Sequence, residues 1–228
     1  MSAPPRPTRP VEPPSLARLG WREVLRGAEI WLVLVLVVGQ AIALHAWRRP
    51  RDLLRLRRDP TARRALADAA STGLVEAFMD LGPTFVKLGQ MIASSPGMFP
   101  EPLADACLRT LDDVPPFPAE EALAIVEDDL GAPAATLFAS VDPEPLSAAS
   151  IAQVHACVLP DGRQAVLKVQ RPDIADRMNR DLRIMYRIAR LVDRTRTGHL
   201  LNAPAIVEDL HQVTNEELDF VLEAHRQA

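Results

Sequence analysis

The hydrophobic positions of the chain fall into three kinds of pattern. An unbroken apolar run covers residues 30–47, helically spaced apolar positions follow from about 66 to 130, and short β-branched runs between turn residues begin near 136. From about Ile174, apolar residues again recur at steps of three and four, which is the spacing of one helix face. The pattern predicts an α+β fold in which a small antiparallel sheet interrupts a mostly helical chain.

The run IWLVLVLVVGQAIALHAW, residues 30–47, contains no Asp, Glu, Lys or Arg. A helix needs roughly 17–25 apolar residues to cross a bilayer, and Trp31 and Trp47 stand where interfacial aromatic residues lie. We therefore expect a transmembrane helix over 30–47. The alternative is a buried core helix with a solvated basic flank, because such a helix can share this length and composition.

Arginine is concentrated on the C-terminal side of the apolar run. Residues 48–65 contain eight arginines, at positions 48, 49, 51, 55, 57, 58, 63 and 64, against Asp52 and Asp59. Basic flanks stay on the cytoplasmic side and attract anionic lipids, so we expect a basic juxtamembrane segment and a cytoplasmic remainder, at the inner membrane if the source is bacterial. The Pro- and Arg-rich residues 1–29 are predicted to be disordered.

Composition narrows the classes of function. The net charge of −4 argues against broad nucleic-acid binding, for which a basic balance is expected. Cys107 and Cys157 form no CxxC motif, and the five histidines form no HExxH pair, so we propose no metal site built by the protein. The two cysteines are expected to be buried apolar residues in a reducing compartment.

Residues 66–135 are predicted to form several helices. The first ends at Gly82, and Pro83 opens the next, PTFVKLGQMIASS, because proline is tolerated in a first helical turn. The segment PEPLADACLRTLDDV is a further helix, and PAEEALAIVEDDLG is another that ends at Gly131.

The strand-like segment that follows carries an unexpected lysine. TLFASV, residues 136–141, and the start of PLSAASIAQVHACVLPDGRQAVLKVQRP are predicted strands, and Asp161-Gly162 is a hairpin signal. Strand alternation places Val166, Lys168 and Gln170 on one face. Lys168 has two interpretations: an edge lysine that prevents aggregation, or a lysine that binds a phosphate.

Three segments together resemble one family. LGPTFVKLGQ, PLSAASIAQVHACVLPDGRQAVLKVQRP and NEELDFVLEA are similar, in this order, to the signatures of the UbiB (AarF, ADCK) family of atypical kinase-like proteins. The resemblance runs from about Glu76 to Ala224. It implies a helical KxGQ extension over residues 66–135, followed by a protein-kinase-like N-terminal lobe over residues 136–228.

The resemblance also implies roles for particular residues. Lys87, Gly89 and Gln90 match the KxGQ motif, which packs over the active site. Glu217 and Asp219 match the ExD motif that engages the KxGQ lysine. An alanine-rich loop, Ala148, Ala149 and Ser150, stands where ordinary kinases have glycines and covers the nucleotide. Lys168 matches the phosphate-binding lysine, and Glu223 matches the glutamate that pairs with it.

The activity that the family implies is that of an ATP/ADP-binding atypical kinase or ATPase that supports the biosynthesis of ubiquinone and related isoprenoid lipids. Its implied partners are the nucleotide, membrane lipids and quinone-biosynthesis proteins. The Mg²⁺ ligands and catalytic-loop residues of a kinase follow the last helix of the N-terminal lobe, so this chain is expected to be an N-terminal fragment. The alternative is a catalytically inactive, membrane-anchored interaction module.

Overall fold

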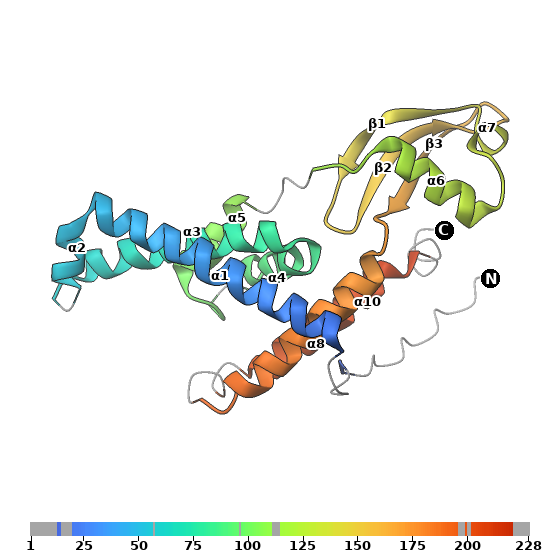
Figure 1. Cartoon of the computed structure of the whole chain (residues 1–228). Helices are drawn as coiled ribbons and strands as arrows, with labels where there is room; N and C mark the ends of the chain where they lie inside the picture. Colours follow the sequence, from blue (N-terminus) through green and yellow to red (C-terminus); the bar gives the residue numbers. More distant parts are fainter. Residues whose placement is uncertain are drawn as a thin grey trace.

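The computed structural model describes residues 13–14, 20–56, 58–95, 97–110, 115–195, 199 and 202–220. Its elements are, in chain order, α1 (Trp21–Arg48), α2 (Pro50–Arg55), α3 (Pro60–Leu81), α4 (Pro83–Ala93), α5 (Glu101–Thr110), α6 (Ala119–Leu130), α7 (Ala134–Leu137), β1 (Ser140–Ala148), β2 (Ala152–Val158), β3 (Gln164–Gln170), α8 (Ile174–Val192) and α10 (Ala203–Leu218). Figure 1 shows the α1–α3 hairpin projecting at one end and the sheet with α6 at the other. The predicted α+β class is confirmed.

Helices α1 and α3 form a long antiparallel hairpin, with α2 at its tip. Asp59 caps α3, because its carboxylate accepts a hydrogen bond from the Thr61 N–H at 2.9 Å. The two helices approach closely at Gly73, where an added Cβ would lie 2.6 Å from the Cβ of Ala41. A larger residue at position 73 would force the two helices apart.

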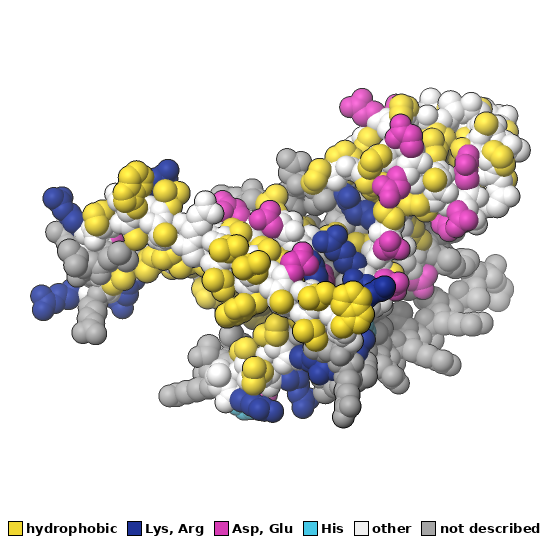
Figure 2. All heavy atoms as spheres, viewed as in Figure 1, with side chains coloured by type: hydrophobic (Ala, Val, Ile, Leu, Met, Phe, Trp, Pro, Cys, Tyr) yellow, Lys and Arg dark blue, Asp and Glu magenta, His cyan; other side chains and the backbone are white. Residues whose placement is uncertain are grey.

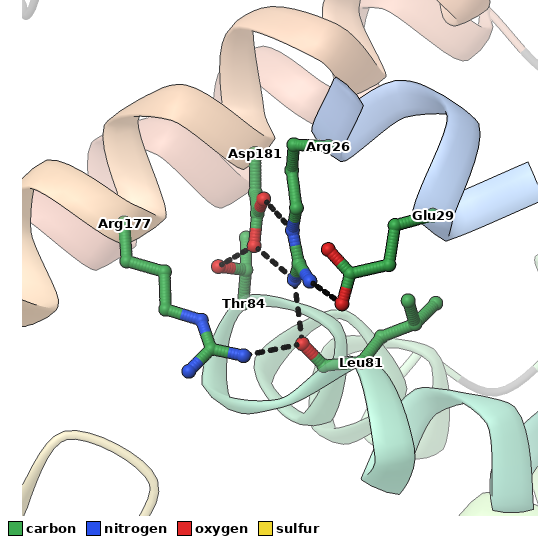
Figure 3. A network of polar contacts seen from close by, with 6 residues as sticks. All are labelled: Arg26, Glu29, Leu81, Thr84, Arg177 and Asp181. Atoms are coloured by element: carbon green, nitrogen blue, oxygen red, sulfur yellow. Dashed lines mark hydrogen bonds and ion pairs between the residues drawn. The ribbon is translucent and has the colours of Figure 1, made fainter. Parts of the chain in front are cut away.

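The start of α1 is fixed by a buried network of charges (Figure 3). The Arg26 guanidinium donates to both carboxylate oxygens of Asp181 in α8, at 2.8 and 3.0 Å, and to the Leu81 carbonyl at 2.7 Å. Thr84 donates to the same carboxylate at 3.1 Å. Burial disfavours the Arg26 charge, but the hydrogen bond and attraction of Asp181 outweigh it, so the pKa of Arg26 is raised.

This network corrects one prediction. Residues 1–29 were expected to be disordered, but α1 begins at Trp21 and residues 21–29 are helical. Glu23 in the first turn of α1 also pairs with Arg183 of α8 at 2.6 Å. Both partners lie more than 150 residues further along the chain, so no local pattern could reveal that this segment is ordered.

The break between α3 and α4 falls at Gly82-Pro83, as predicted. Gly82 has φ +97°, a value that favours glycine, and Pro83 occupies the first turn of α4. The helices around this break share a hydrophobic core drawn from α1, α3, α4, α5 and α8: Ile30, Val75, Phe78, Leu81, Phe85, Val86, Ile92, Ala106, Cys107 and Ile184. This core fixes α4, which carries the KxGQ motif.

The sheet is an antiparallel meander in the order β1-β2-β3. The turn between β2 and β3 contains Gly162 at φ +87°, which confirms the predicted Asp161-Gly162 hairpin. Helix α6 covers one face of the sheet, where Ala122 and Val126 pack against Val169. The opposite face carries Lys168, which the Phe220 ring contacts, and Val166, which is exposed; no described helix packs across the middle of this face.

The prediction for TLFASV was partly wrong. Residues Ala134–Leu137 form the short helix α7, and β1 begins only at Ser140. β1 then continues to Ala148 with shifts in its register against β2 between Val141 and Ser147. Pro143 and Pro145 account for this irregularity, because proline cannot donate to the ladder.

Candidate functional site

Helices α4 and α10 are joined by an ion pair between two predicted site residues. The Lys87 ammonium of α4 donates to Oε1 of Glu217, which lies in the last turn of α10. The Lys87 side chain is only 16% exposed, so this contact is partly shielded from water. The structure therefore brings together two residues that stand 130 positions apart in the sequence.

The remaining KxGQ and ExD residues lie around this pair. Gly89 is buried and Gln90 is half-buried, and the Gln90 carbonyl accepts the Ser94 N–H at the end of α4. A regular helix would turn Glu217 and Asp219 to different sides, but α10 ends at Leu218. Asp219 leaves the helix with φ −88° and ψ 82°, and its side chain is exposed.

Lys168 lies on the uncovered face of β3, close to the end of α10. Its ammonium stands 4.7 Å from the centroid of the Phe220 ring, a cation–π distance. Two residues further along β3, the Gln170 side chain donates to the Leu218 carbonyl at 3.2 Å. The end of β3 is thus held against the end of α10, beside the ExD segment.

Glu223, the predicted partner of Lys168, lies outside the described residues. The Lys168–Glu223 pair therefore stays a prediction.

The alanine-rich loop joins β1 to β2 in a tight turn. Ala148 ends β1, and the Ala149 N–H donates to the Ala152 carbonyl at 2.7 Å. Ser150 and Ile151 are buried. The non-glycine residues with positive φ among those described are Asp173 and Asn202, so this turn does not use the left-handed conformation that favours glycine. Alanine and serine therefore fit it without backbone strain.

Arg171 fixes this loop, and the sequence patterns did not single it out. Its Nε donates to the Ala149 carbonyl at 3.1 Å, and its backbone N–H donates to the Ile151 carbonyl at 2.9 Å. The same guanidinium donates to the Pro115 carbonyl at 2.7 Å and lies over the Phe117 ring at 5.5 Å. Burial lowers the pKa of Arg171, but an arginine stays charged in proteins.

A second missed group is a buried amide in β2. The Gln153 side chain accepts the Phe117 N–H at 3.0 Å and donates to the Phe117 carbonyl at 3.2 Å. It also lies 2.8 Å from Nε2 of His155, whose Nδ1 is 2.8 Å from the Asp142 carbonyl. A carbonyl can only accept, so Nδ1–H donates and Nε2 accepts from Gln153, which assigns a neutral His155. The motif AQVH thus ties the segment before α6 to the sheet.

Residues 109–228 match the family description "ABC1 atypical kinase-like domain". The chain belongs to the ABC1 atypical kinase-like family. The UbiB resemblance found in the sequence is confirmed, because the curated relatives include proteins named UbiB.

Three relatives of this ABC1-family chain illustrate the similarity. The Mycobacterium tuberculosis protein Rv0647c is 40% identical over 80% of this chain and 38% of its own length. A probable protein kinase UbiB from Marinobacter nauticus is 41% identical over 65% of this chain and 27% of its own length. A probable protein kinase UbiB from Cellvibrio japonicus is 43% identical over 64% and 26% of the two chains. The matched part of this chain therefore spans well under half of each relative.

The uncovered face of the ABC1-family sheet combines an apolar surface with a cation. Leu146 and Val166 are 63% and 67% exposed there, and an open recess of about 810 Å³ is lined by these two residues and Ala156 and extends to Val158 and Gln164 at the far end of the sheet, whereas Lys168 lies beyond its lining. Val154 is the cross-strand partner of Lys168. Ala152 pairs with Gln170, so the alanine-rich loop and Lys168 lie at the same end of the sheet.

Proposed function

We propose that this chain is the nucleotide-binding N-terminal part of a membrane-associated atypical kinase or ATPase that binds ATP or ADP. In this proposal Lys168 holds the phosphates and Glu223 orients Lys168. The alanine-rich loop covers the nucleotide, and the exposed apolar side chains of the sheet contact the base. The observation that carries the proposal is the placement of Lys168, the loop and the Lys87–Glu217 pair around one end of the sheet.

The Lys87–Glu217 pair bears on the type of reaction. It fastens α4 across the end of α10, beside the strand that carries Lys168. We propose that α4 thereby occupies the place where a protein substrate would dock. ATP hydrolysis or phosphorylation of a small molecule is then favoured over protein phosphorylation. The names of the UbiB relatives support a role in ubiquinone or related isoprenoid-lipid biosynthesis, with proteins of that process as partners.

Among the described residues, no group of three His, Cys, Asp or Glu side chains is placed to hold a metal ion. We propose that the protein ligands of a nucleotide-bound Mg²⁺ belong to the catalytic elements that the family resemblance implies, because such an ion takes one or two protein carboxylates and otherwise phosphate oxygens.

Membrane association is proposed from α1. It is the helix, among the described residues, that is long and apolar enough to cross a bilayer, with an 18-residue window of mean hydropathy 2.1. A soluble core helix would be mostly buried, whereas only 6% of this window is buried. We propose a cytoplasmic location for the kinase-like part, because the exposed arginines that follow the apolar run favour the cytoplasmic leaflet, where anionic lipids are concentrated.

Nucleotide binding is tested by the melting temperature of the full-length protein with and without Mg-ATP. Lys168→Ala is expected to abolish the ATP-dependent rise, because the phosphates lose their cation. Arg163→Ala is the matched control, since Arg163 is an exposed cation at the start of the same hairpin and pairs with Asp161. An ATP-dependent rise that survives in Lys168→Ala would refute the role of this lysine.

A further inference from the structure

Among the described residues, helix α1 contacts α3 and α8 along one side of its length. Its first turns are held by Arg26 in the buried network and by Ile30 in the helical core. Beyond Ile30, α1 runs along α3, where Val38 and Ala41 lie closest to Gly73. The apolar segment predicted to span a membrane alone is therefore one half of a helical hairpin.

The side of α1 that faces away from α3 is an apolar stripe. Its exposed side chains include Leu25, Leu32, Leu36 and Trp47. At 100° per residue these four positions fall within about 60° of one another around the helix, so they lie on one face. Trp47 is 81% exposed, and Trp31, which is 70% exposed, lies outside this stripe. Figure 2 shows hydrophobic side chains gathered along the hairpin.

The surface between the two helices of the hairpin mixes charged, polar and apolar side chains instead. A groove of about 720 Å³ is lined by Asp68, Thr72 and Glu76 of α3 and, from the other side, by apolar, polar and basic residues between Val37 and Arg49. Asp68, Thr72 and Glu76 are exposed and lie four residues apart along α3. Because Gly73 lies against Ala41, this acidic row stands opposite the middle of the apolar run.

A spanning orientation would bring α3 into the bilayer together with α1. The carboxylates of Asp68 and Glu76 would then leave water for hydrocarbon, where charged side chains are strongly disfavoured. With α1 lying flat, its stripe enters the membrane while α3 remains on the water side. The apolar area is buried in both orientations, but the carboxylates keep their hydration only in the flat one.

We propose that α1 lies in the plane of an anionic membrane surface, with its apolar stripe embedded at the boundary of head groups and acyl chains. The inference rests on the membrane association proposed above and specifies its geometry. Tryptophan favours this boundary, and a helix with one apolar face binds there without crossing. The exposed Arg48, Arg49, Arg51 and Arg58 lie around the hairpin tip and match the charge of anionic head groups (Figure 2).

The depth of three positions distinguishes the orientations. Full-length variants that carry a single tryptophan, at position 32 (L32W), at position 36 (L36W) or as the native Trp47, with the other tryptophans replaced by phenylalanine, are bound to anionic phospholipid vesicles. Lipids brominated at different acyl positions then quench their fluorescence. The flat orientation predicts the same shallow depth for all three. A spanning helix centred near residue 39 would place position 36 about 6–7 Å deeper than position 32 and Trp47, since each residue rises about 1.5 Å.

Three outcomes overturn the inference in different ways. A deeper position 36 means that α1 spans, and membrane association survives. Absence of quenching at all three positions means that a second copy or another part of the protein covers the stripe, and membrane association then fails as well. Nucleotide binding, measured separately by melting temperature, is affected by neither result. The third outcome concerns how much the apolar stripe contributes to vesicle binding.

That contribution is measured by vesicle co-sedimentation of the full-length protein. Leu32→Ser is expected to weaken binding to anionic vesicles roughly tenfold, because one embedded apolar side chain is lost. Leu191→Ser is the matched control, since Leu191 is 62% exposed and Leu32 is 56% exposed, but Leu191 lies on α8. Equal vesicle affinity of the two variants would overturn the assignment of the stripe as the membrane contact.

Discussion

Arg171 connects the alanine-rich loop to the segment that precedes α6. Its guanidinium reaches the carbonyls of Ala149 and Pro115, which lie 22 and 56 residues before it in the sequence. A glycine-rich loop can adapt its backbone to a nucleotide, whereas alanine and serine restrict this freedom. The position of this loop then depends on contacts with residues outside it. Arg171 supplies two of these contacts, to the carbonyls of Ala149 and Ile151.

We predict that Arg171→Gln raises the KM for ATP of the full-length enzyme severalfold and changes kcat much less. The loop would no longer be fixed over the bound nucleotide, whereas the positions of the reacting groups would not change. Arg171→Lys retains the charge with a smaller set of donors and is expected to give an intermediate KM. A loss of kcat with unchanged KM would contradict this positioning role.

Arg26 and Asp181 form a buried ion pair that fixes the start of α1. Arg26→Leu is expected to lower the free energy of unfolding in urea by about 3–5 kcal/mol, because Asp181 would keep a buried charge without its main partner. Arg22→Leu, which changes an exposed arginine one turn earlier in the same helix, is the control and should change stability by less than about 0.5 kcal/mol.

The double variant Arg26→Leu/Asp181→Leu separates charge from packing. It removes both charges together and is expected to regain much of the lost stability. If the double variant were as unstable as the sum of the two single variants, the pair would have no coupling and the network in Figure 3 would not anchor α1.

At the scale of elements, local signals predicted much of the fold. Asp161-Gly162, Gly82-Pro83 and Gly131 each mark a turn or helix end through their own backbone preferences, and the structure has a hairpin or helix boundary at each. Contacts between distant segments could not be predicted from such local signals. The Gln153–Phe117 and Arg26–Asp181 contacts join residues 36 and 155 positions apart, and ordinary polar residues give no local sign of them.

The candidate site likewise contains residues that the sequence or the family resemblance predicted and contacts that neither could predict. Lys87 and Glu217 were connected through the family resemblance, because the spacing of two residues 130 positions apart carries no information by itself. In a regular helix Glu217 and Asp219 would not share a face, and α10 ends at Leu218, between them. Glu223 remains a prediction, since it lies outside the described residues.

The α4–α10 contact is tested by reversing its charges. We predict that Lys87→Glu and Glu217→Lys each destabilise the protein, because like charges would then face one another. The double variant is expected to recover stability through a coupling of about 1 kcal/mol, as for a partly exposed ion pair. Urea unfolding of the four proteins in a double-mutant cycle measures this coupling, and a coupling near zero would show that the pair does not hold α4 to α10.

At the scale of the whole molecule, the two proposed surfaces lie at different ends. The nucleotide surface belongs to the sheet, and the membrane surface belongs to the α1–α3 hairpin, with α8 contacting the start of α1 through Asp181 (Figure 1). Helix α8 directly follows β3, the strand that carries Lys168. This separation allows nucleotide binding and membrane binding to be measured independently.

The central claim is that the nucleotide occupies the uncovered face of the sheet, and hydrogen–deuterium exchange of the full-length protein tests it most directly. With Mg-ATP, we predict slower amide exchange in peptides covering residues 146–158 and 164–170, and unchanged exchange in the α1–α3 hairpin. Slower exchange confined to the hairpin, with none in the sheet, would contradict the account.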